Sequence, residues 1–285
     1  MRLTKRSILI TAIITVFMAT SLVGNALAKD KEAELAYVEW ACATASAYVV
    51  KEVLETKMGY DITLTPVSAA AMWQALAAGD VDFITTAWVP TTHGHYLERV
   101  GDQVEDLGHN LVGTRIGLVV PTYVTIDSIA EMNDHAAKFD NQITGIDPGA
   151  GIMSKTEEAI EVYGLDKMNL MEASDAMMTA VLKDKIANNQ WVVVTGWTPH
   201  WKFGAWDLKY LDDPEGVYGG EEYINTVVRL GLKEDKPDLY KFLDAFEWTA
   251  DDIQTVMAWS EESSPEASAK RWVEENQDKV ASWLP

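Results

Sequence analysis

Cysteine and positive charge are both scarce in this chain of 285 residues. A single cysteine, Cys42, excludes an internal disulfide. It lies in a run of small residues that opens a predicted helix, and without a recognisable catalytic partner we expect a small buried side chain rather than a reactive thiol. The 23 Lys and Arg residues stand against 44 Asp and Glu, for a formal net charge of −21. Such a surface repels nucleic acid, which excludes that class of partner.

The common motifs of nucleotide, metal and nucleophile chemistry are also missing. The chain has no G-x-x-x-x-G-K-[ST] or G-x-G-x-x-G run, no H-E-x-x-H or paired cysteines, and no G-x-S-x-G elbow. His93 and His95 form an H-x-H pair and His200 follows later, but further ligands at suitable spacing are lacking. We therefore expect no metal, no cofactor and no catalytic residues: the protein is predicted not to be an enzyme.

Residues 1–28 have the three parts of a secretory signal peptide. Three basic residues stand within the first six positions, an apolar run extends from Ser7 to Val23, and an Ala-x-Ala cleavage site ends at Ala28. The alternative is an N-terminal membrane anchor, for which the apolar run is short. No cysteine follows it, so we expect no lipid anchor. The sequence predicts a soluble periplasmic protein whose mature chain is long enough for two lobes.

Short β-rich runs alternate with amphipathic helices in both halves of the mature chain, which is typical of parallel sheets covered by helices. Predicted strands are 35–38, 61–66, 82–87, 114–120, 142–146, 169–173, 191–195 and 225–230. Predicted helices are 43–58, 69–78, 128–132, 152–163, 176–187, 237–246, 250–260 and 265–283. The two halves follow the same loose plan, which favours two related α/β lobes rather than a repeat array.

The chain is expected to cross twice between the lobes, and the strands 116–120 and 225–230 are the candidates for these crossings. The first lobe is then discontinuous. The predicted domains are lobe 1, formed by 29–118 plus 222–285, and lobe 2, formed by 119–221.

One signature occurs twice: a strand of small or β-branched residues runs into a tryptophan, and a proline follows two positions later. The tryptophans are Trp88 and Trp197, and Trp40 follows the first strand in a similar way. Ligands of open α/β sheets bind at the carboxyl ends of strands. An indole face attracts an organic cation, so three indoles at strand ends predict a cation site. The remaining tryptophans are expected to pack in the core: Trp73, Trp191, Trp206, Trp248, Trp259, Trp272 and Trp283.

A glycine-rich turn, 147–153, leads from a strand into a helix. A helix start of this kind presents unpaired N–H groups and the positive end of the helix dipole to an anion. The alternative interpretation is a tight connection without a ligand. His93, five residues after Trp88, would donate a hydrogen bond to an anionic group. The three indoles at strand ends and the glycine-rich turn together predict a ligand that is positive at one end and negative at the other.

Five segments make the chain resemble a known family. They are 36–40 (AYVEW), 87–93 (AWVPTTH), 117–121 (GLVVP), 145–153 (GIDPGAGIM) and 195–201 (TGWTPHW). Together they resemble the glycine betaine substrate-binding proteins of ABC importers, over essentially the whole mature chain. The resemblance implies a type II periplasmic-binding-protein fold, in which two α/β lobes close around the ligand like a hinge. It also implies a monomer that delivers the ligand to a membrane permease, whose ATPase lies on the cytoplasmic side.

The resemblance further implies roles for individual residues. The quaternary ammonium group is expected in a cage formed by Trp40, Trp88 and Trp197. The ligand carboxylate is expected at the backbone amides of Gly151 and Ile152 and at the side chain of His93.

The chain departs from many members of the family directly after Trp40, where Ala41-Cys42-Ala43 replaces polar or acidic residues. Smaller neighbours would widen the pocket, so choline, carnitine, proline betaine or a dimethylsulfonio compound remain alternatives to glycine betaine. Osmoprotection and nutrition are both open roles. A different class of function, a secreted enzyme that acts on a methylated amine with His93 or His200 as base, is the second alternative.

Overall fold

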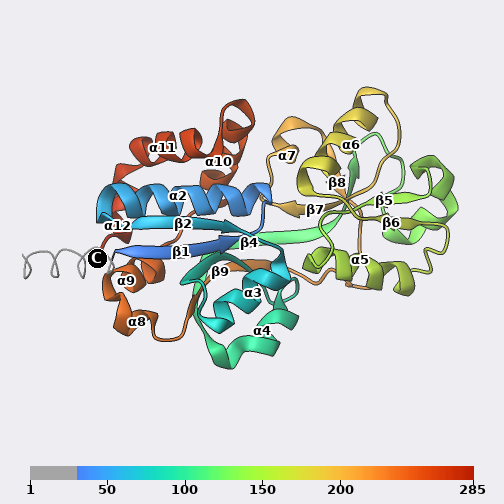
Figure 1. Ribbon diagram of the computed structural model, residues 1–285. Helices are drawn as coiled ribbons and strands as arrows, with labels where there is room; N and C mark the ends of the chain where they lie inside the picture. The colour runs from blue at the N-terminus through green and yellow to red at the C-terminus, as the bar shows by residue number, and fades with distance from the viewer. Residues whose placement is uncertain (1–30) are drawn as a thin grey trace, which may run out of the picture.

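The structure is a computed structural model that describes residues 31–285, so the predicted signal peptide lies outside the described residues. The chain folds into two α/β lobes that lie side by side and share one long strand (Figure 1). The strands follow one another in the sheet in the order β2 (Asp61–Pro66), β1 (Glu32–Tyr37), β3 (Phe83–Val89), β9 (Glu222–Arg229), β4 (Val104–Pro121), β7 (Val194–Thr198), β5 (Gln142–Thr144) and β6 (Asn169–Met171), and β8 (Leu208–Tyr210) pairs with β4. The prediction of two α/β lobes is confirmed.

The larger lobe is built on three parallel strands, with β1 between β2 and β3. Its first elements are β1 (Glu32–Tyr37), α2 (Ala41–Met58), β2 (Asp61–Pro66), α3 (Ala69–Ala78), β3 (Phe83–Val89) and α4 (Gly94–Val100), followed by a short 3-10 turn η1 (Gly101–Gln103). Both α2 and α3 end at a glycine with positive φ, Gly59 and Gly79, where a side chain would be strained. Ser68 caps the start of α3. These local signals explain why the predicted limits of 61–66 and 69–78 are correct.

The smaller lobe repeats the plan, with β5 parallel to both β6 and β7. Its elements are the 3-10 segment η2 (Ile129–Phe139), β5 (Gln142–Thr144), α5 (Gly151–Val162), β6 (Asn169–Met171), α6 (Asp175–Ala187), β7 (Val194–Thr198), α7 (Lys202–Ala205) and β8 (Leu208–Tyr210). The helix predicted at 176–187 begins one residue earlier, because Ser174 accepts a hydrogen bond from the backbone of the first turn. The strand predicted at 191–195 is shifted, since β7 begins only at Val194.

The strand β4 (Val104–Pro121) joins the lobes. It pairs antiparallel with β9 (Glu222–Arg229) as far as Thr114, and with β7 from Arg115 onward. The expected crossing at 116–120 therefore lies within β4. The first ten residues of β4, 104–113, were not expected to be a strand. The second expected crossing, 225–230, is wrong, because β9 pairs with β3 and β4 in the larger lobe. The exact domain limits stay a prediction.

Helices from the C-terminal part of the chain complete the larger lobe, and α10 and α11 lie against α2 (Figure 1). They are α8 (Leu232–Asp235), α9 (Pro237–Ala245), α10 (Ala250–Glu262), α11 (Pro265–Glu275) and α12 (Gln277–Trp283). The single helix predicted at 265–283 is wrong. The Asn276 side chain donates to the carbonyl of Trp272 at 2.8 Å and ends α11 there.

The core of the larger lobe contains four of the seven tryptophans that were predicted to be buried: Trp73, Trp248, Trp272 and Trp283. The other three, Trp191, Trp206 and Trp259, are half-buried. Arg271 covers the ring of Trp259, with its guanidinium carbon 3.7 Å from the ring centroid. A long cationic side chain thus shields this ring from water in place of core packing.

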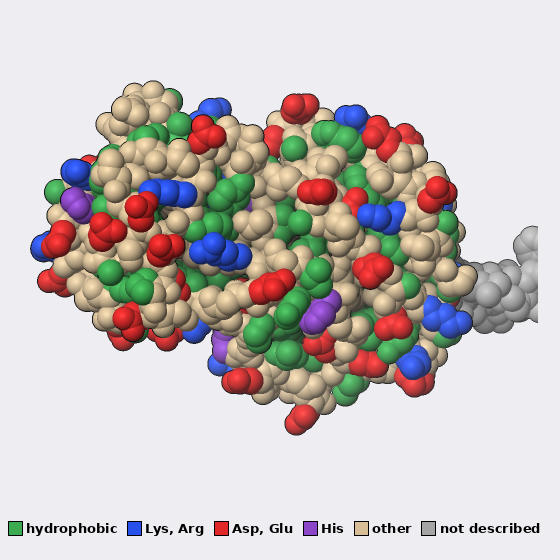
Figure 2. Space-filling view, turned by 180° about the vertical axis from the view of Figure 1, so that it is seen from behind, with side chains coloured by type: hydrophobic (Ala, Val, Ile, Leu, Met, Phe, Trp, Pro, Cys, Tyr) green, Lys and Arg blue, Asp and Glu red, His purple; other side chains and the backbone are tan. Residues whose placement is uncertain are grey.

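Acidic side chains are spread over the visible face of both lobes (Figure 2). They agree with the acidic composition and form no single patch on this face. Among residues 31–285, no helix combines the length and the apolar character needed to cross a membrane.

Candidate functional site

A small cavity lies between the lobes, and residues of both lobes form its wall. The lining residues are Trp40, Cys42, Trp88, Thr92, Ile116, Ile146, Ala150, Gly151, Ile152 and Trp197. The space open to the centre of a water molecule is about 20 Å³, so the cavity is tight. Five of the six predicted site residues line it, and the sixth, His93, directly follows the lining residue Thr92.

Trp40 is the N-cap residue of α2 and lies three residues beyond the end of β1. Its indole Nε1 donates a hydrogen bond to Oδ2 of Asp147 at 3.1 Å, and Asp147 belongs to the smaller lobe. The side chain is 5% exposed. The orientation of this indole is therefore fixed by the lobe that faces it, in addition to the lobe that carries it.

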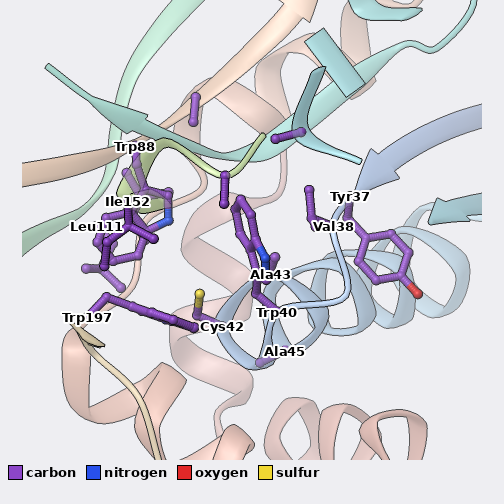
Figure 3. Packing of buried hydrophobic residues seen from close by; sticks show 14 of the residues in the cluster. Tyr37, Val38, Trp40, Cys42, Ala43, Ala45, Trp88, Leu111, Ile152 and Trp197 are labelled. Carbon is purple, nitrogen blue, oxygen red and sulfur yellow. The ribbon is translucent and has the colours of Figure 1, made fainter. Parts of the chain in front are cut away.

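Trp88 and Trp197 occupy equivalent places near the ends of β3 and β7. A cis Xaa-Pro bond follows each of them, at Pro90 and Pro199. Figure 3 shows Cys42 between Trp197 and Trp40, with Trp88 and Ile152 on the same side as Trp197. The three predicted cage tryptophans are thus brought together on one cavity.

Gly151 and Ile152 form the first turn of α5, which points its N-terminus at the cavity. The N-cap residue, Ala150, has no side chain that accepts a hydrogen bond. Neither amide has a hydrogen-bond partner within residues 31–285. A Cβ at Gly151 would lie 1.9 Å from the carbonyl oxygen of Thr92, so close contact between the lobes requires glycine here. Two free N–H groups and the positive helix end therefore face the cavity.

His93 is fully buried and directly follows the lining residue Thr92, and its ring centroid lies 5.9 Å from that of Trp40. The backbone N–H of Trp88 donates to its Nδ1 at 3.1 Å, so the ring hydrogen lies on Nε2. Nε2 has no partner within the described part of the chain. Burial lowers the pKa of His93 to about 3, with a small contribution from His95. The ring is therefore a neutral donor at physiological pH.

Three hydrogen bonds join the lobes around the cavity. Besides the bond from Trp40 to Asp147, the amide of Ala41 donates to Asp175 Oδ2 at 2.9 Å. The hydroxyl of Tyr96 donates to the carbonyl of Gly149 at 2.8 Å. These bonds, together with the burial of all three indoles, show that the lobes are closed.

Sequence reasoning missed several of these residues. Asp147 stands inside the glycine-rich turn, but its role depends on Trp40, which is 107 positions away. Asp175 is a helix-start residue without any local motif. Of the three small residues after Trp40, Cys42 lines the cavity, whereas Ala41 and Ala43 do not. The prediction that Cys42 is buried is confirmed, and burial raises the pKa of its thiol to about 12.

The chain also matches a described protein family. The model of OpuAC, the substrate binding domain of ABC-type glycine betaine transport systems, matches residues 31–275. The chain belongs to this family. The resemblance found in the sequence is therefore confirmed, and so is the expectation of a transport binding protein.

Individual members of the OpuAC family support the assignment. The glycine betaine/carnitine transport binding protein GbuC of Listeria monocytogenes is 50% identical over 153 residues, which cover 53% of this chain and 51% of that protein. This chain thus spans about half the length of that curated relative.

Two crystal structures are similar over almost their whole length. ProX of Borrelia burgdorferi, a glycine betaine and L-proline binding protein, is 40% identical with a TM-score of 0.87, covering 90% of this chain and 97% of that one. Lactococcal OpuAC, closed around glycine betaine, is 39% identical with a TM-score of 0.86, covering 90% and 100%. These neighbours confirm the predicted type II periplasmic-binding-protein fold.

Proposed function

We propose that the protein captures glycine betaine, or a closely related quaternary ammonium zwitterion, between its lobes and delivers it to an ABC permease. One observation carries the proposal: a single small cavity combines three indoles with the amides of Gly151 and Ile152, which lack a partner among the described residues, and the buried Nε2–H of His93, next to the lining residue Thr92, also lacks one. A ligand of this cavity has to present a cation to the indoles and a hydrogen-bond acceptor to the donors at the same time.

The indoles of Trp40, Trp88 and Trp197 suit a trimethylammonium group. A quaternary ammonium has no N–H to donate, so a carboxylate partner would lose hydration without gaining a hydrogen bond. Each indole contact with a desolvated cation contributes about 0.5 to 2 kcal/mol. Three such contacts contribute about 1.5 to 6 kcal/mol of the roughly 8 kcal/mol that micromolar affinity requires, so the groups that hold the carboxylate have to supply the rest.

The amides of Gly151 and Ile152 and the Nε2–H of His93 suit a carboxylate. Hydrogen bonds to an ionised acceptor are about twice as strong as neutral ones, and the N-terminus of α5 adds its positive dipole. Because burial keeps His93 neutral, it holds the anion by a hydrogen bond and adds no net charge to the cavity.

Ligand binding and lobe closure are coupled in this proposal. A ligand that contacts both Trp40 of the larger lobe and Gly151 of the smaller one stabilises the closed state, since both contacts exist only there. We infer that the closed form docks on the permease as a monomer. Family membership places the protein among extracytoplasmic transport proteins, and the signal peptide predicted in 1–28 agrees with periplasmic export.

The alternative of a secreted enzyme gains no support from His200. Its Nδ1 accepts from the amide of Lys202 at 3.1 Å, and its Nε2 lies 3.0 Å from Asp175. Both ring nitrogens are therefore engaged, and neither is available as a base. We propose a binding protein without enzymatic activity.

The narrow cavity favours compact ligands. Its space of about 20 Å³ for the centres of water-sized spheres corresponds to one or two water molecules, so any of the candidate ligands requires the walls to move apart. Glycine betaine and choline require less movement than the bulkier carnitine or proline betaine. The Listeria relative named for glycine betaine and carnitine matches over only half of its length.

Calorimetric titration tests the proposal directly. Glycine betaine should bind with micromolar affinity, and proline betaine and carnitine more weakly. The proposal is wrong if neither heat nor tryptophan fluorescence changes with any of glycine betaine, choline, carnitine or proline betaine.

A further inference from the structure

Lys202 is a buried cation next to the cage. Its side chain is 0% exposed, and its ammonium nitrogen lies 4.1 Å from the centroid of the Trp197 ring. This nitrogen has no hydrogen-bond partner among residues 31–285. Burying a lysine without a hydrogen bond is costly, and its contact with the indole offsets part of this cost.

Three ionisable groups face this ammonium. Asp175 comes from α6, His200 from the turn after β7, and Cys42 from the start of α2. The carboxylate of Asp175 already accepts hydrogen bonds from His200 Nε2 and from the amide of Ala41. It balances the charge of Lys202 through space and makes no direct bond to it.

The ammonium and the cavity share the same indole. Trp197 lines the cavity, whereas Lys202 does not. Lys202 therefore covers a part of the Trp197 ring that the cavity does not reach. A ligand cation in the cage contacts the same π system from the cavity side.

We propose that Lys202 is a specificity determinant that selects zwitterions against ligands with a net positive charge. This inference rests on the proposed function. A cation that contacts the cavity side of Trp197 would lie roughly 8 to 9 Å from the Lys202 ammonium, a distance at which two like charges repel strongly in a medium of low dielectric constant. Choline experiences this repulsion without compensation. In glycine betaine the attraction of the carboxylate to Lys202 offsets part of it.

The charge on Lys202 can be switched without a substitution. Burial lowers its pKa to about 8, against the opposing effects of the Asp175 carboxylate and of Cys42. The pKa of Cys42 is about 12 and that of His200 about 4, and the pKa of Asp175 is also below its ordinary value. Between pH 7 and pH 9.5, Lys202 is therefore the one group of these four that changes its charge.

The experiment measures the dissociation constants of choline and glycine betaine at pH 7 and pH 9.5. In the wild-type protein, the affinity for choline relative to glycine betaine should rise at least threefold at pH 9.5. In Lys202→Met, the same ratio should already be raised at pH 7 and should not change with pH. The exposed Lys183→Met is the matched control and should behave like the wild type.

A wild-type ratio that stays constant between the two pH values overturns the inference, as does a Lys202→Met ratio equal to that of the wild type. If Lys202→Met does not fold, the wild-type comparison at two pH values still decides. Absence of binding by both ligands would instead overturn the proposed function, and the two failures are therefore distinguishable.

Discussion

The indole of Trp40 and the carboxylate of Asp147 form a hydrogen bond of 3.1 Å between the two lobes. One wall of the cage is therefore held in place by a residue of the glycine-rich turn, four positions before the helix start that faces the cavity. The cation end and the anion end of the site are connected through this bond. Opening of the lobes would release both ends together.

Asp147→Ala should weaken the binding of glycine betaine and of choline by a similar factor, about tenfold. The substitution removes a charged acceptor that orients Trp40, and such a hydrogen bond is worth about 1.4 kcal/mol or more. Calorimetry with both ligands checks this prediction. The exposed Asp134→Ala is the control, and a loss confined to one ligand would show that Asp147 acts on the ligand rather than on the cage.

Gly151→Ala should abolish tight closure and leave the unliganded fold intact. The new Cβ would lie 1.9 Å from the carbonyl oxygen of Thr92, which belongs to the opposite lobe. We expect a loss of affinity of at least about 100-fold, or about 2.7 kcal/mol, with little change in the melting temperature without ligand. A Cβ at Gly101 meets no atom within 4 Å, so Gly101→Ala is the matched control. Normal affinity in Gly151→Ala would mean that the lobes close differently.

His93→Ala should weaken the binding of glycine betaine more than that of choline, because only glycine betaine carries a carboxylate. Loss of one hydrogen bond to an ionised group corresponds to about 1.5 to 3 kcal/mol, or roughly 10- to 100-fold in affinity. Titrations of the variant with both ligands measure the difference. His95→Ala, at an exposed position, is the control, and equal losses for both ligands would remove His93 from the carboxylate site.

The free energy of unfolding should fall as the pH is lowered from about 6.5 toward 4. Burial lowers the pKa of His93 to about 3, and burial together with the Lys202 ammonium lowers that of His200 to about 4. Both rings stay neutral in the folded protein but become protonated in the unfolded chain near their ordinary pKa of 6.5. The unfolded state then binds more protons than the folded state. Each histidine therefore lowers the free energy of unfolding by about 1.4 kcal/mol for every pH unit by which the pH falls in this range.

Urea unfolding at pH 7 and pH 5 measures this dependence. His93→Ala should lose less stability than the wild type between these two pH values, by about 2 kcal/mol. An identical pH dependence in both proteins would indicate that His93 is accessible to protons in the folded state.

Local signals in the sequence were sufficient for much of the fold. Gly59, Gly79 and the Ser68 cap fix helix ends by backbone geometry and short-range hydrogen bonds, so α3 was predicted with correct limits. The break at Asn276 depends on one side-chain amide that returns to a carbonyl four residues earlier. Asn is a weaker signal for a helix end than Gly, and Asn276 does not adopt the left-handed conformation that is typical of such ends, so the two helices were predicted as one.

The site was predicted where its residues stand at strand ends, and missed where its contacts are long-range. Trp88 and Trp197 could be predicted from the repeated motif, and Gly151 could be predicted from the turn that precedes it. Asp175 accepts a hydrogen bond from the amide of Ala41, which lies 134 positions away in the sequence. Lys202 contacts Trp197 only because the chain turns sharply after β7. The contact of Asp175 depends on how the lobes pack, and that of Lys202 depends on the geometry of the turn after β7, and no sequence motif encodes either of them.

The crystal structure of the protein with glycine betaine tests the central claim most directly. The account predicts the trimethylammonium group between the indoles of Trp40, Trp88 and Trp197, and the carboxylate within hydrogen-bond distance of the Gly151 and Ile152 amides and of His93 Nε2. A ligand with its carboxylate directed away from the start of α5, or one bound outside the cavity between the lobes, would contradict it.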